Sequence, residues 1–250
     1  MTLEVLLTPA EFSLLKQRDL SDTVCVVFDI LRATTTMMTA LSNGADGIIP
    51  VSGIHEALSL RKKNPDLLLA GEREGVRIRS DQTGGVDFDL ANSPREFTQE
   101  KVRGKTIVMT TSNGTRALQA CSGARKILIG SFLNLRPVAA WIIEQQPQEL
   151  ILVCSGTGEQ AALEDTLAAG ALCEQIWPQY AGGKVSDAAG IARKIYSLSQ
   201  MDLMGAMNDA QNGRRLLANP ELRGDVAFCL ERETLGFLAE CKNGLVQKMD

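Results

Sequence analysis

The sequence contains a single histidine, His55, among its 250 residues. One imidazole excludes a phosphohistidine mechanism that needs a second histidine as acid, and it excludes metal sites built mainly of histidine. His55 follows Gly53 at the predicted start of an exposed helix, where a surface role is expected. Acid, base or metal chemistry must therefore come from carboxylates.

Long apolar runs and cysteine pairs are also missing. No apolar run reaches about 18 residues, and the first residues lack the basic and then apolar pattern of a signal peptide. We therefore expect a cytoplasmic protein with no membrane partner. The six cysteines include no C-x-x-C pair, so buried free thiols are expected rather than disulfides.

The overall charge is weakly acidic. A formal net charge of −4 gives no basic field for nucleic acid, so no nucleic-acid partner is expected. A small molecule bound in a local cationic pocket is the favoured partner, and a homodimer is left open. With 44% hydrophobic and 22% charged residues, the chain can bury a large core.

Apolar runs of four to seven residues alternate with longer segments of helical period. This alternation is typical of a parallel sheet covered by helices. The predicted fold is therefore α/β, with three αβα layers and a mostly parallel sheet. The predicted strands are 3–7, 24–29, 47–51, 67–70, 106–110, 126–129 and 149–154. The predicted helices are 34–41, 115–121, 137–144, 161–176, 187–197 and 201–217.

One α/β unit is expected over residues 1–250. Residues 26–45 and 152–171 both read as strand, polar loop, helix and Leu-x-x-Gly-Ala, which favours two similar lobes, about 1–103 and 104–250, facing one cleft. Residues 71–94 lack a strong period, and such long stretches are often functional. Ligands are expected at the carboxyl edge of the sheet, where helix N-termini present unpaired N–H groups.

Residues able to carry chemistry follow one predicted strand at its carboxyl end. Asp29 ends the strand, and Arg32, Thr34, Thr35 and Thr36 open the next helix. A carboxylate, a guanidinium group and several N–H and hydroxyl donors at one corner suit a metal-bound phosphate. Asp29 could ligate Mg²⁺ or attack phosphorus. The arginine and the threonines could bind the anionic oxygens.

A second corner of the same kind follows another predicted strand. Thr111, Asn113, Gly114, Thr115 and Arg116 combine polar donors, an Asn-Gly turn and an arginine at a helix start. This corner predicts a second anion site and a catalytic role for the arginine. Neutral donors at equivalent strand ends could complete the pocket, and these are Ser131, Asn134, Ser155 and Gly156.

Acidic residues elsewhere are candidate metal ligands. Glu72 directly follows a predicted strand beside Arg73, which could reach substrate. Glu164 and Asp165 lie early in an otherwise apolar helix, where carboxylates are unusual. Together with Asp29, these acids form the predicted Mg²⁺ ligand set.

Six segments taken in order form a specific set. They are FDILRATTT at 28–36, GER at 71–73, NSP at 92–94, TSNGTR at 111–116, GSFLN at 130–134 and LEDTLAAGA at 163–171. The set resembles the 2-phosphosulfolactate phosphatase family of coenzyme M biosynthesis, also called the ComB-like phosphatases, with a looser match over 212–229. The chain departs from the family pattern in a longer loop at 76–86 and at Ala91, where glycine is expected.

The resemblance implies Mg²⁺-dependent removal of phosphate from 2-phosphosulfolactate on a three-layer αβα fold, with Asn92 and Ser93 at the substrate. A substrate with phosphate, carboxylate and sulfonate groups needs several cationic anchors. The candidate anchors are Arg32, Arg73, Arg116 and Arg214.

The predicted mechanism places Mg²⁺ on Asp29 with Glu72 or Asp165, while arginines and helix N–H groups stabilise the transition state and water attacks phosphorus. A covalent aspartyl-phosphate at Asp29 is the alternative route. The alternative function is a non-catalytic binding protein for a small anionic metabolite, which would use the same anion sites without turnover.

Overall fold

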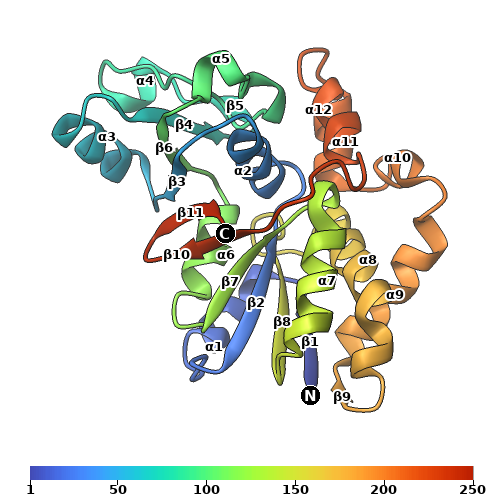
Figure 1. The fold of residues 1–250 in the computed structure, drawn as a ribbon. Coiled ribbons are helices and arrows are strands. Elements are labelled where there is room, and N and C mark those ends of the chain that lie inside the picture. Colours follow the sequence, from blue (N-terminus) through green and yellow to red (C-terminus); the bar gives the residue numbers. More distant parts are fainter. Residues whose placement is uncertain (250) are drawn as a thin grey trace.

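The computed structural model describes residues 1–249 as an α/β fold with helices on both faces of an 11-stranded sheet (Figure 1). The strands are β1 Thr2–Leu6, β2 Thr23–Phe28, β3 Gly47–Pro50, β4 Leu68–Arg73, β5 Val76–Arg77, β6 Thr106–Thr110, β7 Lys126–Gly130, β8 Glu149–Cys154, β9 Lys184–Val185, β10 Ala239–Lys242 and β11 Leu245–Lys248. The α-helices are α1 Phe12–Leu15, α2 Ala33–Ser42, α3 Ile54–Lys63, α4 Ser80–Thr83, α5 Gln99–Val102, α6 Gly114–Ala120, α7 Leu135–Gln145, α8 Leu163–Tyr180, α9 Asp187–Ser199, α10 Leu203–Ala206, α11 Gln211–Leu217 and α12 Arg223–Cys229. The predicted fold class, three layers with a mostly parallel sheet, is confirmed.

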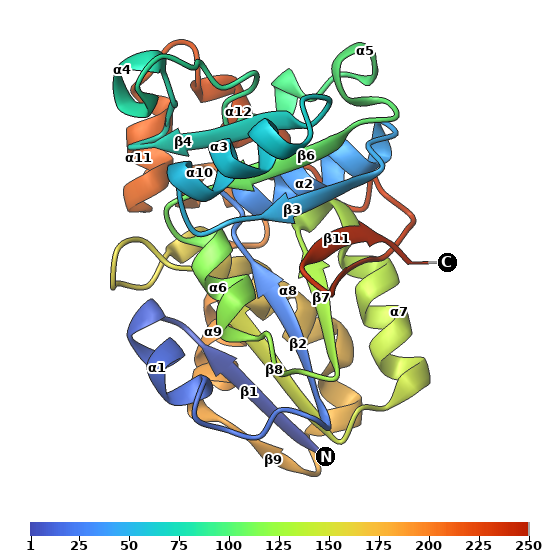
Figure 2. The same cartoon turned by 90° about the vertical axis from the view of Figure 1, so that its left-hand side faces the viewer.

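The sheet has two parallel parts joined by a hairpin (Figure 2). Strands β4, β6 and β3 run parallel in one part, and β7, β2, β8, β1 and β9 run parallel in the other. The antiparallel hairpin β10–β11 lies between β7 and β3. Strands β1 and β2 both pair with β8. The two lobes expected at about 1–103 and 104–250 stay a prediction.

Strand β2 shows why the sheet carries two helical layers. All six of its residues are buried. Val24, Val26 and Phe28 belong to one apolar cluster with α7 and α8, while Cys25 and Val27 belong to another with α1, α2 and α6. Successive strand residues face opposite sides, so a strand buried on both faces reads as an unbroken apolar run. This run is the signal that predicted the strand.

All seven predicted strands are confirmed, as are the predicted helices between residues 34 and 197. Strand β4 continues three residues past its predicted end, so Glu72 lies within the strand rather than after it. The single helix expected over 201–217 is wrong. Asp202 caps the short α10 by accepting the Gly205 N–H at 2.7 Å, and α11 begins only at Gln211. Local side-chain bonds of this kind compete with helix continuation.

The predictions omit the hairpin β10–β11. Its turn, Asn243 and Gly244, has φ values of 52° and 77°, the left-handed conformation that an Asn-Gly pair adopts readily in a two-residue turn. The sequence signal for the hairpin is thus present.

All six cysteines are free thiols and His55 is exposed in α3, as expected; five of the cysteines are buried, whereas Cys241 is only partly buried. None of the helices described within residues 1–249 is long and apolar enough to cross a membrane.

Candidate functional site

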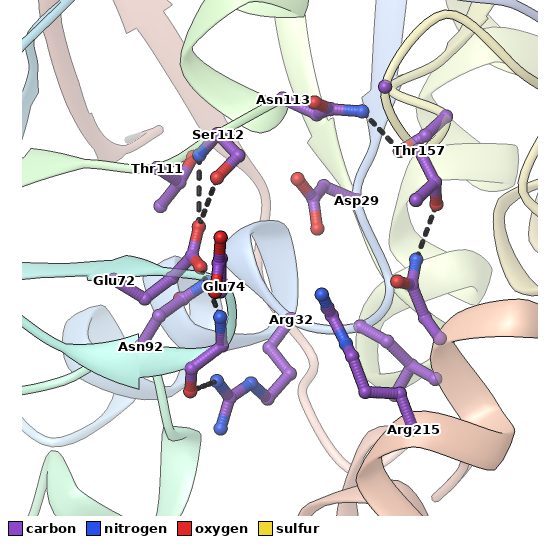
Figure 3. A pocket seen from close by; sticks show the side chains of 15 residues that line it. Asp29, Arg32, Glu72, Glu74, Asn92, Thr111, Ser112, Asn113, Thr157 and Arg215 are labelled. Carbon is purple, nitrogen blue, oxygen red and sulfur yellow. Dashed lines mark hydrogen bonds between the residues drawn. The ribbon is translucent and has the colours of Figure 1, made fainter.

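A cavity of about 230 Å³ lies where strand ends from both parts of the sheet meet (Figure 3). Strands β2, β4, β6 and β8 all deliver residues to it, and α11 contributes from the remaining side. Open parallel sheets bind ligands at this edge. The lining residues are Asp29, Leu31, Arg32, Glu72, Glu74, Gly75, Asn92, Thr111, Ser112, Asn113, Gly156, Thr157, Gly158, Asn212 and Arg215.

Asp29 follows β2 and points into the middle of the cavity (Figure 3). Its Oδ1 accepts the Ala33 N–H at 3.0 Å. Burial is the main cause that raises the pKa of Asp29 to about 6; Glu72 and Glu164 raise it further, while the Ala33 N–H and Arg32 oppose the shift. A carboxylate with a raised pKa in a cavity is a candidate for metal binding, nucleophilic attack or proton transfer.

The three threonines after Asp29 shape the loop and do not line the cavity. The Thr34 hydroxyl accepts the Asp29 N–H and can donate to the Asp29 carbonyl, both at 3.0 Å. Thr35 donates to the carbonyl five residues earlier at 3.1 Å, and Thr36 bonds the carbonyl of Asn92 at 3.4 Å. All three are fully buried, so direct substrate contacts by these side chains have no support in the geometry.

Glu72 joins β4 to the loop after β6. Its Oε1 accepts both the Ser112 N–H, at 3.0 Å, and the Ser112 hydroxyl, at 2.9 Å. Its Oε2 accepts the Gly75 N–H at 2.7 Å. These three bonds fix the carboxylate in the cavity wall, which it shares with Asp29.

The turn after β6 supplies Thr111 and Asn113 to the cavity, as the sequence predicts. Asn113 Nδ2 donates to the carbonyls of Ser155 and Gly156 at 3.2 and 2.6 Å, which joins the end of β6 to the end of β8. Gly156 lines the cavity, whereas Ser155 does not. Thr115 lies behind the turn and accepts the Thr111 N–H at 3.3 Å.

Gly114 opens α6 directly against the Asp29 carboxylate. A Cβ at this position would lie 2.6 Å from Asp29 Oδ2 and 2.8 Å from the Cβ of Ala33. Both distances are shorter than van der Waals contact, so the close approach of the two strand-end loops requires glycine here.

Arg32 borders the cavity, but its guanidinium group is held by the protein. Its Nη1 donates to Asp225 Oδ2 at 2.6 Å and its Nη2 to the Gly75 carbonyl at 2.8 Å, and both charged side chains are almost completely buried. Asp225 also accepts the Ser93 hydroxyl at 2.8 Å. Ser93 is therefore bonded to this ion pair. Its neighbour Asn92 lines the cavity, and the buried Asn92 Oδ1 has no hydrogen-bond partner among residues 1–249.

Four other predicted residues lie away from the cavity. Arg73 donates to the preceding backbone carbonyl at 2.6 Å, and Arg116 pairs with Glu159 at 2.8 Å on the surface. Asn134 Oδ1 accepts the N–H of Ser131 at 2.9 Å and its hydroxyl at 3.0 Å, which closes the turn after β7. Their positions give no support to the substrate or catalytic roles expected of them.

Glu164 and Asp165 lie behind the cavity wall in the first turn of α8. Asp165 accepts the Ile30 N–H at 2.8 Å and the Gly156 N–H at 3.0 Å, and Glu164 Oε1 accepts Asn212 Nδ2 at 2.7 Å. Burial raises the pKa of both acids, and neighbouring carboxylates raise that of Asp165 further. Asp165 therefore joins the loops after β2 and β8, Glu164 holds α11 through Asn212, and neither acid lines the cavity.

The structure adds cavity residues that the sequence reasoning missed. Glu74 and Gly75 come from the β4–β5 turn, and Asn212 and Arg215 come from α11. The looser family match over 212–229 includes Asn212 and Arg215, but the predicted anion anchor in this segment is Arg214. The Arg214 guanidinium donates to the carbonyls of residues 208 and 209 and lies outside the cavity lining.

Several known proteins similar to this chain carry the same name. Residues 10–244 match the family model described as 2-phosphosulpholactate phosphatase. A "Probable 2-phosphosulfolactate phosphatase" of Caldicellulosiruptor saccharolyticus is 36% identical over 234 residues, which are 92% of this chain and 93% of that protein. Proteins of the same name from Caldanaerobacter subterraneus subsp. tengcongensis (36% over 242 residues, 94% and 95% of the two chains) and Thermotoga petrophila (36% over 220 residues, 88% and 89%) are similarly close. The resemblance seen in the six segments is confirmed, and the chain belongs to the 2-phosphosulpholactate phosphatase family.

Proposed function

We propose that this chain is a phosphatase that hydrolyses the phosphate ester of a small anionic hydroxy acid, with 2-phosphosulfolactate as substrate and sulfolactate and phosphate as products. The family and the names of the relatives support the reaction class. The observation that carries the proposal is the convergence of Asp29, Glu72 and Arg215 on one cavity at the carboxyl ends of the strands (Figure 3). Its volume of about 230 Å³ suits a molecule of a few carbon atoms.

The charges around the cavity disfavour a polyanion unless a cation binds with it. The charged lining groups are the carboxylates of Asp29, Glu72 and Glu74 and the guanidinium groups of Arg32 and Arg215. Because Asp225 compensates the charge of Arg32, the cavity has more negative than positive charge available. A substrate with three acidic groups would be repelled by this excess.

Mg²⁺ is the cation in this proposal, held by Asp29 and Glu72. Carboxylate oxygens are the protein ligands that Mg²⁺ prefers. The negative charge of Glu72 raises the pKa of Asp29 in addition to the effect of burial, which indicates that nearby positive groups do not fully compensate the two carboxylates. Within residues 1–249, no three His, Cys, Asp or Glu side chains are grouped as a ready metal site. That suits Mg²⁺, which commonly takes one or two carboxylates and completes its shell with water and substrate phosphate. Bound there, it would polarise the phosphoryl group and offset substrate charge.

Glu164 and Asp165 are left out of this ligand pair because neither lines the cavity. Their bonds to Asn212 and to the N–H groups of Ile30 and Gly156 give them a supporting role instead. The expected cytoplasmic location and the homodimer stay predictions from the sequence.

In the proposed reaction, a water oxygen bonds to phosphorus, the bond between phosphorus and the ester oxygen breaks, and the ester oxygen takes up a proton. Asp29 lies where it could hold the cation or attack phosphorus itself; the second route gives an aspartyl-phosphate that water then hydrolyses. Trapping with radiolabelled substrate separates the routes, since only the second leaves label on the protein.

Phosphate release from 2-phosphosulfolactate, measured with Mg²⁺, without it and with EDTA, tests the function. We expect release that depends on Mg²⁺ and is lost in Asp29→Asn and strongly reduced in Glu72→Gln. Tight binding without metal-dependent release would favour the non-catalytic binding protein. Loss of activity in Asp29→Asn with full activity in Glu72→Gln would overturn the shared metal site.

A further inference from the structure

Arg215 is the cationic side chain that reaches into the cavity. It extends from α11 toward Asp29 with its guanidinium beside Gly75, whereas the Arg32 guanidinium is bonded to the Gly75 carbonyl and to Asp225 (Figure 3). Arg215 is exposed, and none of the ion pairs found within residues 1–249 includes it. Since Asp225 compensates Arg32, Arg215 carries the available positive charge of the cavity lining.

Buried contacts fix the helix that presents Arg215. Asn212 precedes it by three residues and therefore lies on the same helical face. The Asn212 Nδ2 donates to Thr157 Oγ1 at 2.6 Å and to Glu164 Oε1 at 2.7 Å, and Asn212 is buried. These bonds tie α11 to the loop after β8 and to α8, so the base of the arginine is held while its long side chain spans the cavity.

The cavity has a buried side and an exposed side. Asp29 and Glu72, at 8% and 7% exposure, form the buried side, where the proposed metal and the transferred phosphate belong. Arg215 enters from the exposed side. Its planar group can donate two parallel N–H bonds to a pair of oxygens on a second acidic group.

We infer that Arg215 binds the sulfonate of the substrate, the acidic group that is not transferred, and thereby selects substrates that carry it. In 2-phosphosulfolactate, the carboxylate is attached to the carbon that bears the phosphate, whereas the sulfonate lies one carbon further away. With the phosphate on the buried side, the sulfonate is the group that extends toward the exposed side. This assignment rests on the proposed function and adds a specificity residue to it.

A pair of substrates tests the assignment, because phospholactate keeps the phosphate and carboxylate but lacks the sulfonate. Arg215→Met should lower kcat/KM for 2-phosphosulfolactate about 10- to 100-fold, mainly through KM, as expected for lost hydrogen bonds to a charged group. The same variant should change kcat/KM for phospholactate less than about threefold. Arg215→Lys keeps the charge but not the planar pair of donors, so it should recover part of the loss.

Arg214→Met is the matched control, since Arg214 neighbours Arg215 on α11 and lies outside the cavity lining. It should affect both substrates equally. Equal losses for both substrates in Arg215→Met would overturn the inference, because they would place the arginine at the phosphate or in the fold. So would an unchanged KM for 2-phosphosulfolactate.

Failure of the proposed function gives a different result. If the wild type releases phosphate from neither substrate, the phosphatase proposal fails while the inference about Arg215 still has its own measurement. Isothermal titration with sulfolactate and with lactate then compares the wild type and Arg215→Met. Arg215→Met should weaken sulfolactate binding at least about tenfold. An unchanged Kd, or a wild type that does not prefer sulfolactate to lactate, overturns the inference.

Discussion

Replacing Asp225 with alanine should destabilise the protein by about 3–5 kcal/mol, the usual cost of leaving one charge of a buried ion pair without its partner. Asp225 accepts Arg32 Nη1 at 2.6 Å and the Ser93 hydroxyl at 2.8 Å. The side chains of the ion pair are 2% and 0% exposed, so bulk water does not solvate the charge left on Arg32; Arg95, which lies 3.8 Å from Asp225 Oδ1, is half exposed and keeps its water. Since domains are stable by only about 5–15 kcal/mol, this loss is a large fraction of the total.

Urea unfolding followed by tryptophan fluorescence measures the effect as a shift in midpoint at constant slope. The matched control is Glu174→Gln, which removes a surface ion pair with Arg193, whose side chains are 46% and 34% exposed. Such pairs contribute about 0–1 kcal/mol. The double variant Arg32→Met with Asp225→Leu removes both buried charges and should regain much of the lost stability. The reasoning is refuted if Asp225→Ala is as mild as the surface control, or if the double variant is no better than Asp225→Ala.

Further predictions concern Asp29 and its neighbour. Without divalent cations, Asp29→Asn should raise the free energy of unfolding at pH 8. The folded-state pKa of about 6 lies above the ordinary aspartate value of 3.8, so ionisation costs stability as pH rises through this window. The gain should vanish at about pH 4 in urea titrations, and a gain that does not vary with pH would contradict it. In wild-type phosphate release at limiting Mg²⁺, kcat/KM should fall as pH drops through about 6, because protonated Asp29 can neither hold a cation nor attack phosphorus; a flat profile from pH 5 to 8 would exclude this role. Gly114→Ala should lower kcat/KM about 100-fold by displacing the carboxylate, whereas Gly53→Ala, whose Cβ would meet nothing within 4 Å, should leave it unchanged.

The strands that frame the site could be predicted because their signal is local. Strands such as β2 and β8 are buried on nearly their whole length, and each ends at a polar residue that begins a loop. The parallel arrangement then brings the strand ends to one edge, which is why Asp29, Thr111, Asn113 and Gly156 were correctly expected near one another. Shared position at this edge follows from topology and does not depend on detailed packing.

Roles that depend on the direction of a side chain could not be predicted in this way. Arg32 and Asp225 are 193 residues apart, and no local pattern marks this aspartate among the other acids of the chain. Without that partner, Arg32 reads as an anion anchor; with it, the same guanidinium is a compensated, buried group. The role predicted for Ser93 changes for the same reason, since its hydroxyl donates to Asp225.

The choice between Arg214 and Arg215 shows the limit most sharply. Neighbouring residues on a helix point about 100° apart, so only one of the two can face a given cavity. Asn212 decides which, because its buried bonds to Thr157 and Glu164 turn one face of α11 inward, and the residue three positions later shares that face. Glu164 lies on α8, so the facing of α11 is set by a contact between helices that are far apart in sequence. A family motif can therefore identify the segment that lies at the site, but the packing of that segment determines which of its residues faces the cavity.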